Sequence, residues 1–267
     1  MTWSAPNGTV DGASRDLAPE RRRRLCTIVE ARGSARLEEL SAALGVSQAT
    51  VRRDLDELAA EGRLRRVHGG AVAIDERAGE PHFDAKAAEA AGEKERIATR
   101  AVELLSPTDT VYLDSGSTVL AAARLLRGWG RLTVVTNSLP AAAELAGRGP
   151  RLIVVGGEFR DRSQALVGPL TRLLLDTIHV DRALMGTYAI SLEDGLTTTD
   201  PAEAFTKELV LARAREVILL AHSRKLGTRS LVGAGRLESV DVLVTDGGID
   251  DRTTRALERR GIKVITA

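Results

Sequence analysis

The chain has 267 residues, and 38 lysines and arginines oppose 37 aspartates and glutamates, which leaves a formal net charge of +1. This length allows two domains, whereas the near-neutral charge gives no support by itself for binding nucleic acid. Cys26 is the one cysteine of the sequence, which excludes an intramolecular disulfide, and no Cys/His spacing is typical of zinc. No apolar run approaches the roughly 20 residues that cross a membrane, so we expect a cytoplasmic protein without a membrane partner.

The N-terminal end predicts a tail followed by a helix. Residues 1–18 are polar and lack periodicity, so we expect a disordered tail, and they contain no apolar core typical of a secretory signal. Leu25, Ile28 and Val29 then form the apolar stripe of a helix, with Cys26 beside it as a small packing residue. The arginines at 21–24 could contact phosphates, but solvation is favoured because they lie at the unfavourable end of the helix dipole.

The next residues predict two helices joined by a tight turn. Leu37, Leu40 and Leu44 recur at helical spacing and form one buried stripe. Gly45 is suited to the left-handed conformation that ends a helix. The hydroxyl of Ser47 can accept a hydrogen bond from an unpaired first-turn amide, so we expect a second helix to begin there.

The second helix has an apolar and a polar face. Val51, Leu55 and Leu58 share one face, whereas the opposite face is small, polar and doubly cationic near its start. Such a face suits a recognition helix, whose first residues enter the major groove of DNA. The residues expected to contact DNA from this helix are Ser47, Gln48, Thr50, Arg52 and Arg53.

A basic hairpin is predicted directly after this helix. Leu64–Val67 and residues 71–74 resemble two short strands around a glycine turn, and Gly62 closes the helix before them. This pattern is typical of the wing of a winged helix-turn-helix. Its expected DNA contacts are Arg65, Arg66 and His68. The alternative is a small helical hairpin whose arginines are merely solvated.

The amino-acid sequence of this region resembles that of a known family. The segment Val46-Ser47-x-x-Thr50-Val51-Arg52-Arg53-Asp54-Leu55, followed by Leu64-x-Arg66-x-His68-Gly69-Gly70-Ala71, strongly resembles the N-terminal domain of DeoR-family transcriptional regulators. The resemblance implies a winged helix-turn-helix DNA-binding domain over residues 19–74. It also implies operator DNA as a partner.

The remainder predicts a second, α/β domain over residues 93–267, after an alanine-rich linker at 75–92 that Pro81 interrupts. Short apolar runs predict buried strands at 111–113, 132–135, 152–155, 183–185, 217–220, 242–244 and 264–265. Amphipathic stretches between them predict helices at 119–126, Leu139–Leu145 and 202–214. The acid, proline and glutamate of Asp200-Pro201-Ala202-Glu203 are typical of a helix start. This alternation predicts a mostly parallel sheet covered by helices on both faces.

Ligands of such sheets bind at the carboxyl ends of the strands. Three polar or glycine clusters follow predicted strands there: Asp114-Ser115-Gly116-Ser117-Thr118, Thr136-Asn137-Ser138 and Gly156-Gly157-Glu158. The first has the chemistry of a phosphate site, because its glycine permits close approach, its hydroxyls donate and a helix start supplies amides. Taken alone, it could equally be an ordinary strand-to-helix turn.

This second half resembles the DeoR-family sensor domain, which has the fold seen in ribose-5-phosphate isomerase and glucosamine-6-phosphate deaminase. The matching pieces include Lys94-Glu95-x-Ile97-Ala98, Val134-Val135-Thr136-Asn137-Ser138, Leu166-Val167-Gly168-Pro169 and Gly195-Leu196-Thr197-Thr198. The resemblance implies a non-catalytic receptor for phosphorylated sugars. Residues 115–118 would then hold phosphate, and Asp114 with the Asn137 and Gly156 turns would border the sugar. Lys207 and Lys225 would be cationic ligands, although structural or solvated roles remain open.

One position departs from the family pattern. Where the family commonly has Asp-Ser-x-Lys, this chain has His222-Ser223-Arg224-Lys225, so an expected ligand-facing carboxylate becomes an imidazole. Recognition of hydroxyls would change from acceptance alone to donation or acceptance, depending on the tautomer. The alternative is that His222 lies on a strand-end loop and contacts no ligand.

The favoured hypothesis is a repressor of a carbohydrate catabolic operon that a phosphorylated sugar releases from DNA, although repression and activation are not distinguished. A helix-turn-helix reader needs two copies on DNA, so we expect a homo-oligomer, either dimer or tetramer. The alternative is a sugar-phosphate isomerase-like or deaminase-like enzyme with a DNA-binding extension. No nucleophile, metalloprotease, nucleotide or dinucleotide motif is present, so no cofactor or metal is expected. A regulator whose pocket has lost its ligand is a third possibility.

Overall fold

The computed structural model describes residues 18–32, 34–60, 63–67, 69–73 and 80–267. The chain divides into two compact units between Gly79 and Glu80. The stretch 75–92, which the sequence predicts to be a linker, is helical from Phe83, and the Phe83 side chain is buried in the core of the second unit. None of the described helices combines the length and the apolar character needed to cross a bilayer.

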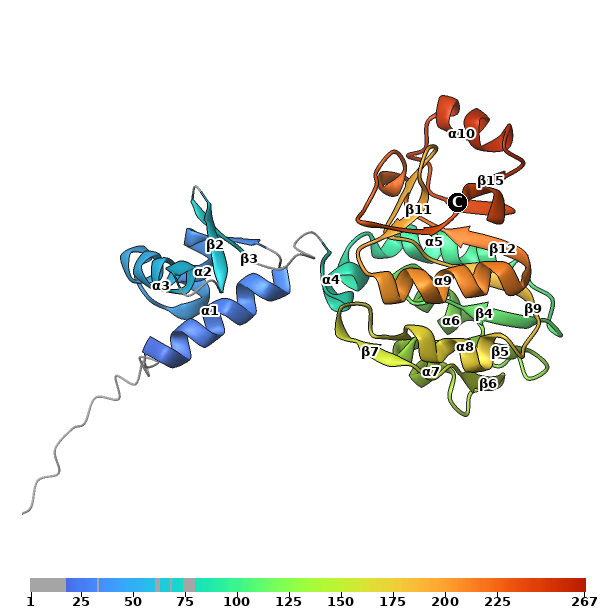
Figure 1. The fold of residues 1–267 in the computed structure, drawn as a ribbon, viewed down its shortest axis with the longest axis horizontal. Helices are drawn as coiled ribbons and strands as arrows, with labels where there is room; N and C mark the ends of the chain where they lie inside the picture. Colours follow the sequence, from blue (N-terminus) through green and yellow to red (C-terminus); the bar gives the residue numbers. More distant parts are fainter. Residues whose placement is uncertain (1–17, 33, 61–62, 68, 74–79) are drawn as a thin grey trace, which may run out of the picture. The chain divides into compact units, whose positions relative to one another are not determined.

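The N-terminal unit contains the two predicted helices of the helix-turn-helix (Figure 1). Its elements are α1 (Ala18–Arg32), β1 (Ser34–Arg36), α2 (Leu37–Leu44), α3 (Gln48–Ala60), β2 (Leu64–Val67) and β3 (Gly70–Ala73). Gly45 ends α2 in the predicted left-handed conformation, with φ of 64°. Leu25, Leu40, Val51 and Leu55 are buried together, as helical spacing predicts, and Cys26 lies in the same core.

The strands of this unit form an antiparallel sheet in the order β1-β3-β2. The hairpin of β2 and β3 was predicted, but β1 was not, because three residues are too few to show a period. Gly70 explains how β1 fits. A Cβ built on Gly70 would lie 2.2 Å from the carbonyl oxygen of Ala35 in β1, so only glycine permits the two strands to pair here.

Within residues 80–267, all of which are described, one parallel sheet of seven strands contains all seven predicted strands. They are β4 (Thr110–Leu113), β5 (Thr133–Thr136), β6 (Arg151–Val154), β9 (Val180–Met185), β12 (Ala214–Leu220), β14 (Val242–Thr245) and β15 (Lys263–Thr266). The spatial order is β15-β14-β12-β9-β4-β5-β6, and each neighbouring pair is parallel. The predicted α/β fold class is therefore confirmed.

Helices cover both faces of this sheet (Figure 1). One core joins the sheet to α4 (Phe83–Ala88), α5 (Ala91–Val102), α6 (Ser117–Leu125) and α7 (Leu139–Leu145). A second core joins it to α8 (Arg172–Leu175), α9 (Pro201–Arg213) and α10 (Asp251–Glu258). Leu113 packs in the first core and its neighbour Tyr112 in the second. Because the strands are buried on both sides, they are continuous apolar runs, which is why the sequence predicted them.

Shorter elements were not predicted, although several of them, such as β7 and β10, follow the carboxyl ends of sheet strands. The strands are β7 (Glu158–Arg160), β8 (Ala165–Val167), β10 (Ala189–Ser191), β11 (Gly195–Thr198) and β13 (Val232–Gly235). The 3-10 turns are η1 (Asp161–Ser163), η2 (Pro169–Thr171), η3 (Ser223–Lys225) and η4 (Leu237–Ser239). The start of α9 matches its prediction, since the Asp200 carboxylate accepts hydrogen bonds from the amides of Ala202 at 2.9 Å and Glu203 at 3.1 Å.

Candidate DNA-binding and effector sites

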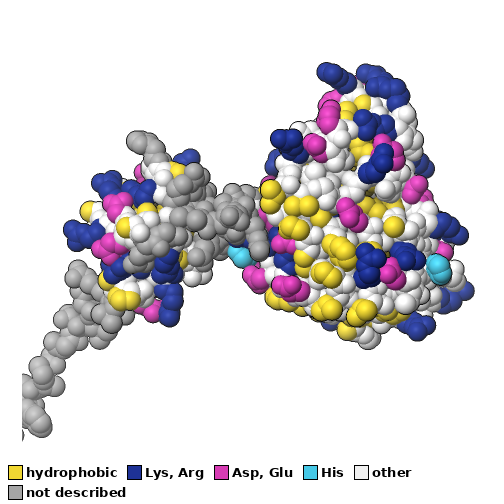
Figure 2. Space-filling view, viewed as in Figure 1, with side chains coloured by type: hydrophobic (Ala, Val, Ile, Leu, Met, Phe, Trp, Pro, Cys, Tyr) yellow, Lys and Arg dark blue, Asp and Glu magenta, His cyan; other side chains and the backbone are white. Residues whose placement is uncertain are grey.

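The predicted recognition helix, α3, presents its polar start to solvent. The Ser47 hydroxyl accepts a hydrogen bond from the Thr50 amide at 3.2 Å, which caps the helix as predicted. Gln48, Arg52 and Arg53 are exposed, and Thr50 is half-buried against the cap. Basic side chains are plentiful on the visible surface of this unit (Figure 2). The arrangement leaves two guanidinium groups available to base edges or phosphates.

The predicted wing residues have three different situations. Arg66 donates to the Gly70 carbonyl at 2.9 Å and pairs with Asp56 of α3 at 2.9 Å, so it braces the wing against the helix. Arg65 lies in β2. His68 lies outside the described residues.

An ion pair that the sequence did not predict holds α1 against α3. Arg21 donates from Nε to Asp54 at 2.6 Å and from Nη2 at 3.1 Å, in a two-pronged contact. Asp54 is 3% exposed. The favoured interpretation of the 21–24 run as a solvated charge run is therefore wrong for Arg21. The sequence did contain a signal for this ion pair, since Asp54 is a charged residue within the apolar stripe of Val51 and Leu58. A buried carboxylate requires a partner.

In the C-terminal unit, the Asp114–Thr118 loop joins β4 to α6 as predicted. Gly116 has φ of 134°, which favours glycine, and α6 begins at Ser117. Ser115 and Thr118 are buried side chains at this helix start. A helix start with adjacent hydroxyls is suited to an anion.

Asp114 and Lys207, both predicted to contact effector, form a buried ion pair with each other. The Asp114 carboxylate also accepts from the Gly186 amide at 2.9 Å, and the Lys207 ammonium donates to the Gly186 carbonyl at 3.0 Å. Burial disfavours the charged lysine, but the carboxylates of Asp114 and Glu203 outweigh it and raise the pKa of Lys207 above its ordinary value. The pair therefore forms a buried, charged floor beneath the loop.

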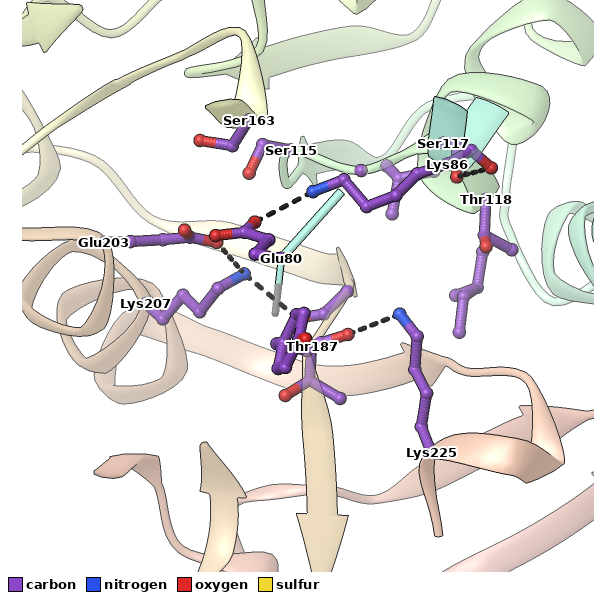
Figure 3. Close-up of a pocket in the computed structure, with 15 residues that line it drawn as sticks. Glu80, Lys86, Ser115, Ser117, Thr118, Ser163, Thr187, Glu203, Lys207 and Lys225 are labelled. Carbon is purple, nitrogen blue, oxygen red and sulfur yellow. Dashed lines mark hydrogen bonds and ion pairs between the residues drawn. The ribbon is translucent and has the colours of Figure 1, made fainter. Parts of the chain in front are cut away.

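A pocket of about 500 Å³, with the space at its mouth included, opens above this floor (Figure 3). Predicted effector residues that line it are Ser115, Gly116, Ser117, Thr118, Lys207 and Lys225. Lys225 donates to the Thr187 carbonyl at 2.5 Å. Among the described residues, no carboxylate lies within ion-pairing distance of its ammonium. Burial, together with repulsion from neighbouring lysines, lowers the pKa of Lys225 to about 8.

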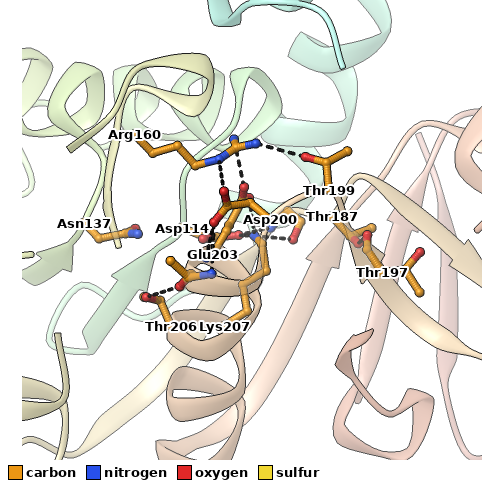
Figure 4. Close-up of polar contacts among 12 residues, drawn as sticks. Asp114, Asn137, Arg160, Thr187, Thr197, Thr199, Asp200, Glu203, Thr206 and Lys207 are labelled. Carbon is orange, nitrogen blue, oxygen red and sulfur yellow. Dashed lines mark hydrogen bonds and ion pairs between the residues drawn. The ribbon is translucent and has the colours of Figure 1, made fainter. Parts of the chain in front are cut away.

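Sequence reasoning missed the charged network on the other side of this pocket (Figures 3 and 4). Glu80 is 4% exposed and pairs with Lys86 at 2.8 Å and with Arg160 at 2.5 Å. Arg160 also lies 3.1 Å from Glu203 and 3.4 Å from Asp200. Although burial opposes ionisation of Glu80, its hydrogen bond from Arg160 and the charge of Lys86 lower its pKa to about 2. Because the pKa of Glu80 is lowered and that of Arg160 is raised, the two form a charged pair near neutral pH.

Comparison with known proteins identifies both units. The DeoR C terminal sensor domain matches residues 89–247, and the DeoR-like helix-turn-helix domain matches residues 21–77. The chain belongs to the DeoR family of transcriptional regulators. The predicted DNA-binding regulator and its family are thereby confirmed.

Relatives of this DeoR-family chain match over nearly its whole length. The HTH-type transcriptional regulator GlpR of Haloferax volcanii is 38% identical and aligns over 93% of this chain and 98% of its own. The glycerol-3-phosphate regulon repressor of Escherichia coli K12 is 32% identical and aligns over 85% of this chain and 90% of its own. Ribose 5-phosphate isomerase A of Methanocaldococcus jannaschii has a TM-score of 0.38 and 20% identity over 50% of this chain and 53% of that one. Likeness that weak carries no argument about chemistry.

Besides Asp114 and His222, five predicted effector residues of this DeoR-family regulator lie outside the lining of the pocket above the Asp114–Lys207 pair. The Thr136 hydroxyl donates to the Leu113 carbonyl at 2.7 Å, and the Ser138 hydroxyl accepts from the first turn of α7 at 3.3 Å. Asn137 donates to the Leu166 carbonyl at 3.0 Å, which ties β5 to β8. The remaining two are Gly156 and Gly157, and Gly157 packs so tightly on the Val167 backbone that a Cβ would lie 2.8 Å away. The contacts of Thr136, Asn137 and Ser138 join backbone segments, while the Oδ1 of Asn137 is buried without a hydrogen-bond partner in the part of the chain that the structure describes.

His222 lines a second pocket, which shares Lys86, Ser117 and Lys225 with the first. Its Nδ1 accepts from the Arg224 amide at 3.2 Å and lies 3.3 Å from the Asp246 carboxylate. Asp246 in turn accepts from the Ser223 amide at 2.7 Å and hydroxyl at 2.8 Å. His222 is thus part of the framework that positions η3, the turn carrying Lys225.

Proposed function

We propose that this DeoR-family regulator represses genes of carbohydrate catabolism and leaves its operator when a phosphorylated sugar binds its sensor. The observation that carries the proposal is the half-buried Lys225 ammonium, which has no carboxylate partner among the described residues and lies beside the hydroxyls and amides of residues 115–118. A phosphate dianion would supply the missing countercharge and accept hydrogen bonds from the loop. The similar Escherichia coli protein is named a glycerol-3-phosphate regulon repressor, which supports an effector of this chemical class.

A receptor fits the pocket better than an isomerase does. An enzyme that moves a proton between sugar carbons needs a free base within reach of the substrate. Asp114, the carboxylate at the start of the loop, already accepts from Lys207 and from the Gly186 amide. Oδ2 of Asp114 is thus held by the buried ammonium and by a backbone amide, so we propose binding without turnover.

The active form is proposed to be a homo-oligomer assembled through the sensor unit. Two recognition helices must match half-sites about 34 Å apart or a multiple of that spacing. Exposed apolar side chains gather on one face of the sensor, over β7, α8 and the start of α9 (Figure 2). They include Leu173 at 77% exposed, Leu170 at 62% and Phe159 at 48%. A contiguous apolar surface of this kind is typical of an interface.

Effector binding would act by changing the spacing of the two DNA-binding units in the oligomer. An effector that binds one sensor arrangement better than the other shifts the population toward it, by a coupling of about 1–3 kcal/mol. An effector with equal affinity for both arrangements would leave operator binding unchanged.

The test is operator binding titrated with a panel of sugar phosphates, followed by fluorescence anisotropy on a duplex selected from a random pool. We expect at least one sugar phosphate to release wild-type protein. Ser117→Asp should abolish this response through like-charge repulsion with the phosphate. The matched control is Thr108→Asp, because Thr108 is exposed in the turn before β4. Unchanged release in Ser117→Asp would place the effector elsewhere.

A further inference from the structure

Glu80 occupies the pocket in the manner of a bound anion. Its carboxylate accepts from the Lys86 ammonium at 2.8 Å, from the Arg160 guanidinium at 2.5 and 3.3 Å, and from the Thr199 hydroxyl. An ammonium, a guanidinium and a hydroxyl are also the groups that bind a phosphate in proteins. Figure 3 shows the Lys86 side chain directed to this carboxylate. Lys86, a cation of the pocket lining, and Arg160 beside it are therefore already engaged by the chain itself.

The same segment also engages the phosphate loop. The Ser117 hydroxyl at the start of α6 donates to the Lys86 carbonyl at 3.3 Å. Lys86 lies in α4, which begins three residues after Glu80. Both the carboxylate and the carbonyl thus occupy donors that a phosphate in this pocket requires. Simultaneous binding would bring two anions to the same cations, which is unfavourable in a buried site.

Displacement of Glu80 by phosphate would matter because of where Glu80 lies in the chain. Glu80 is the first residue of the C-terminal unit, and Gly79 is the last residue of the unit that contains α3. If Glu80 were released from Lys86 and Arg160, the sensor would no longer hold the residue at which its chain continues into the DNA-binding unit. After the exchange the phosphate would pair with Lys86, and Arg160 would keep its ion pairs with Asp200 and Glu203, so neither cation would be left unpaired.

We propose that Glu80 is an internal occupant of the effector site, and that an effector phosphate displaces its carboxylate and frees residues 80–88. The inference rests on the proposed function, since it assumes that the pocket binds phosphate. It adds the route by which the sensor reaches the DNA-binding unit. The effector binds the displaced arrangement alone, which is the differential affinity that a switch requires.

The first test is amide hydrogen exchange of the full-length wild-type protein with and without saturating inorganic phosphate. We expect exchange to increase in peptides that contain residues 80–88 and to decrease at residues 115–118. Slower exchange in both regions would overturn the inference, because phosphate would then bind alongside Glu80. Protection absent from residues 115–118 would overturn the proposed phosphate site itself. The two failures are thereby distinguished.

The second test is Glu80→Gln, which retains the side-chain size and removes the competing charge. We expect its affinity for inorganic phosphate to rise roughly tenfold, a typical size for coupled sites. Its operator affinity without phosphate should equal that of phosphate-saturated wild type. Glu95→Gln is the control, because Glu95 is exposed on α5. Phosphate affinity equal to wild type in a folded Glu80→Gln protein would overturn the inference, and the wild-type exchange experiment decides it if that variant fails to fold.

Discussion

Lys207 and Asp114 form an ion pair in which each side chain is 2% exposed, although 93 residues separate them in the chain. The pair joins the middle of α9 to the end of β4, so it connects a helix on one face of the sheet to the loop proposed to bind phosphate. Desolvation of two charges is costly, and their attraction offsets it only while both remain. The pair is therefore sensitive to loss of either partner.

Lys207→Met is expected to lower the free energy of unfolding by about 3–5 kcal/mol, because Asp114 would remain as a buried charge without its cation. Urea denaturation followed by circular dichroism measures this loss. The matched control is Lys263→Met at an exposed position, which should change stability by less than about 0.5 kcal/mol.

The double variant Asp114→Asn, Lys207→Met isolates the charge effect. It should recover part of the stability lost in Lys207→Met, since no uncompensated charge would remain. Equal stability of Lys207→Met and the wild type would contradict a buried, energetically coupled pair.

Much of the fold could be predicted from local sequence. Runs such as residues 217–220 are apolar throughout because β12 is buried between two layers of helices. The capping residue Ser47 and the terminating Gly45 similarly act within one turn of chain. By contrast, β7 and β10 have three residues each, too few for alternation to distinguish them from loops. Their positions depend on packing with distant segments.

The candidate site was only partly predictable for the same reason. The hydroxyls of residues 115–118 follow a strand and begin a helix, so their place at the pocket could be predicted from neighbours alone. Glu80 and Arg160 lie 80 residues apart, and each resembles an ordinary solvated charge in its own segment. Family resemblance nominated Lys207 and Asp114 separately as effector contacts. Their mutual contact required the three-dimensional structure.

Arg52→Ala and Arg53→Ala should each weaken operator binding and leave the fold intact, because both side chains are exposed on α3. Loss of a bidentate contact to a base should cost about 1–3 kcal/mol and relax specificity at one position. Loss of a phosphate contact should instead weaken binding to all duplexes. The slope of log affinity against log salt concentration should then become shallower by about one. Anisotropy titrations over a range of salt concentrations separate these cases. Undiminished affinity in both variants would contradict the assignment of α3 as the recognition helix.

Leu173→Glu is expected to dissociate the proposed homo-oligomer, because it would bury a carboxylate within an apolar contact. Light scattering after size-exclusion chromatography measures the mass directly. Operator affinity should fall with the mass, since single heads lose the second half-site. Glu258→Gln, at an exposed position on α10, serves as the control and should leave both quantities unchanged. If the Leu173→Glu protein kept the wild-type mass in solution, this face would not be part of the interface.

Affinity for a phosphorylated effector is expected to fall as the pH rises through about 8. Burial, together with repulsion from neighbouring lysines, lowers the pKa of Lys225 to about 8, so the ammonium form prevails below that pH and the neutral amine above it. An ordinary lysine would keep its charge to about pH 10. A phosphate monoester has its second pKa near 6, so the ligand remains a dianion throughout the range from about pH 7 to about 10.

Calorimetric titration over that range measures this dependence, and buffers of different ionisation enthalpy report the proton that Lys225 takes up when effector binds near pH 9. Lys225→Gln should bind more weakly at neutral pH and lose the dependence, because its amide does not titrate. Lys263→Gln should retain both the affinity and the dependence of the wild type. The same pH dependence in Lys225→Gln would assign the titration to another group and remove Lys225 from phosphate binding.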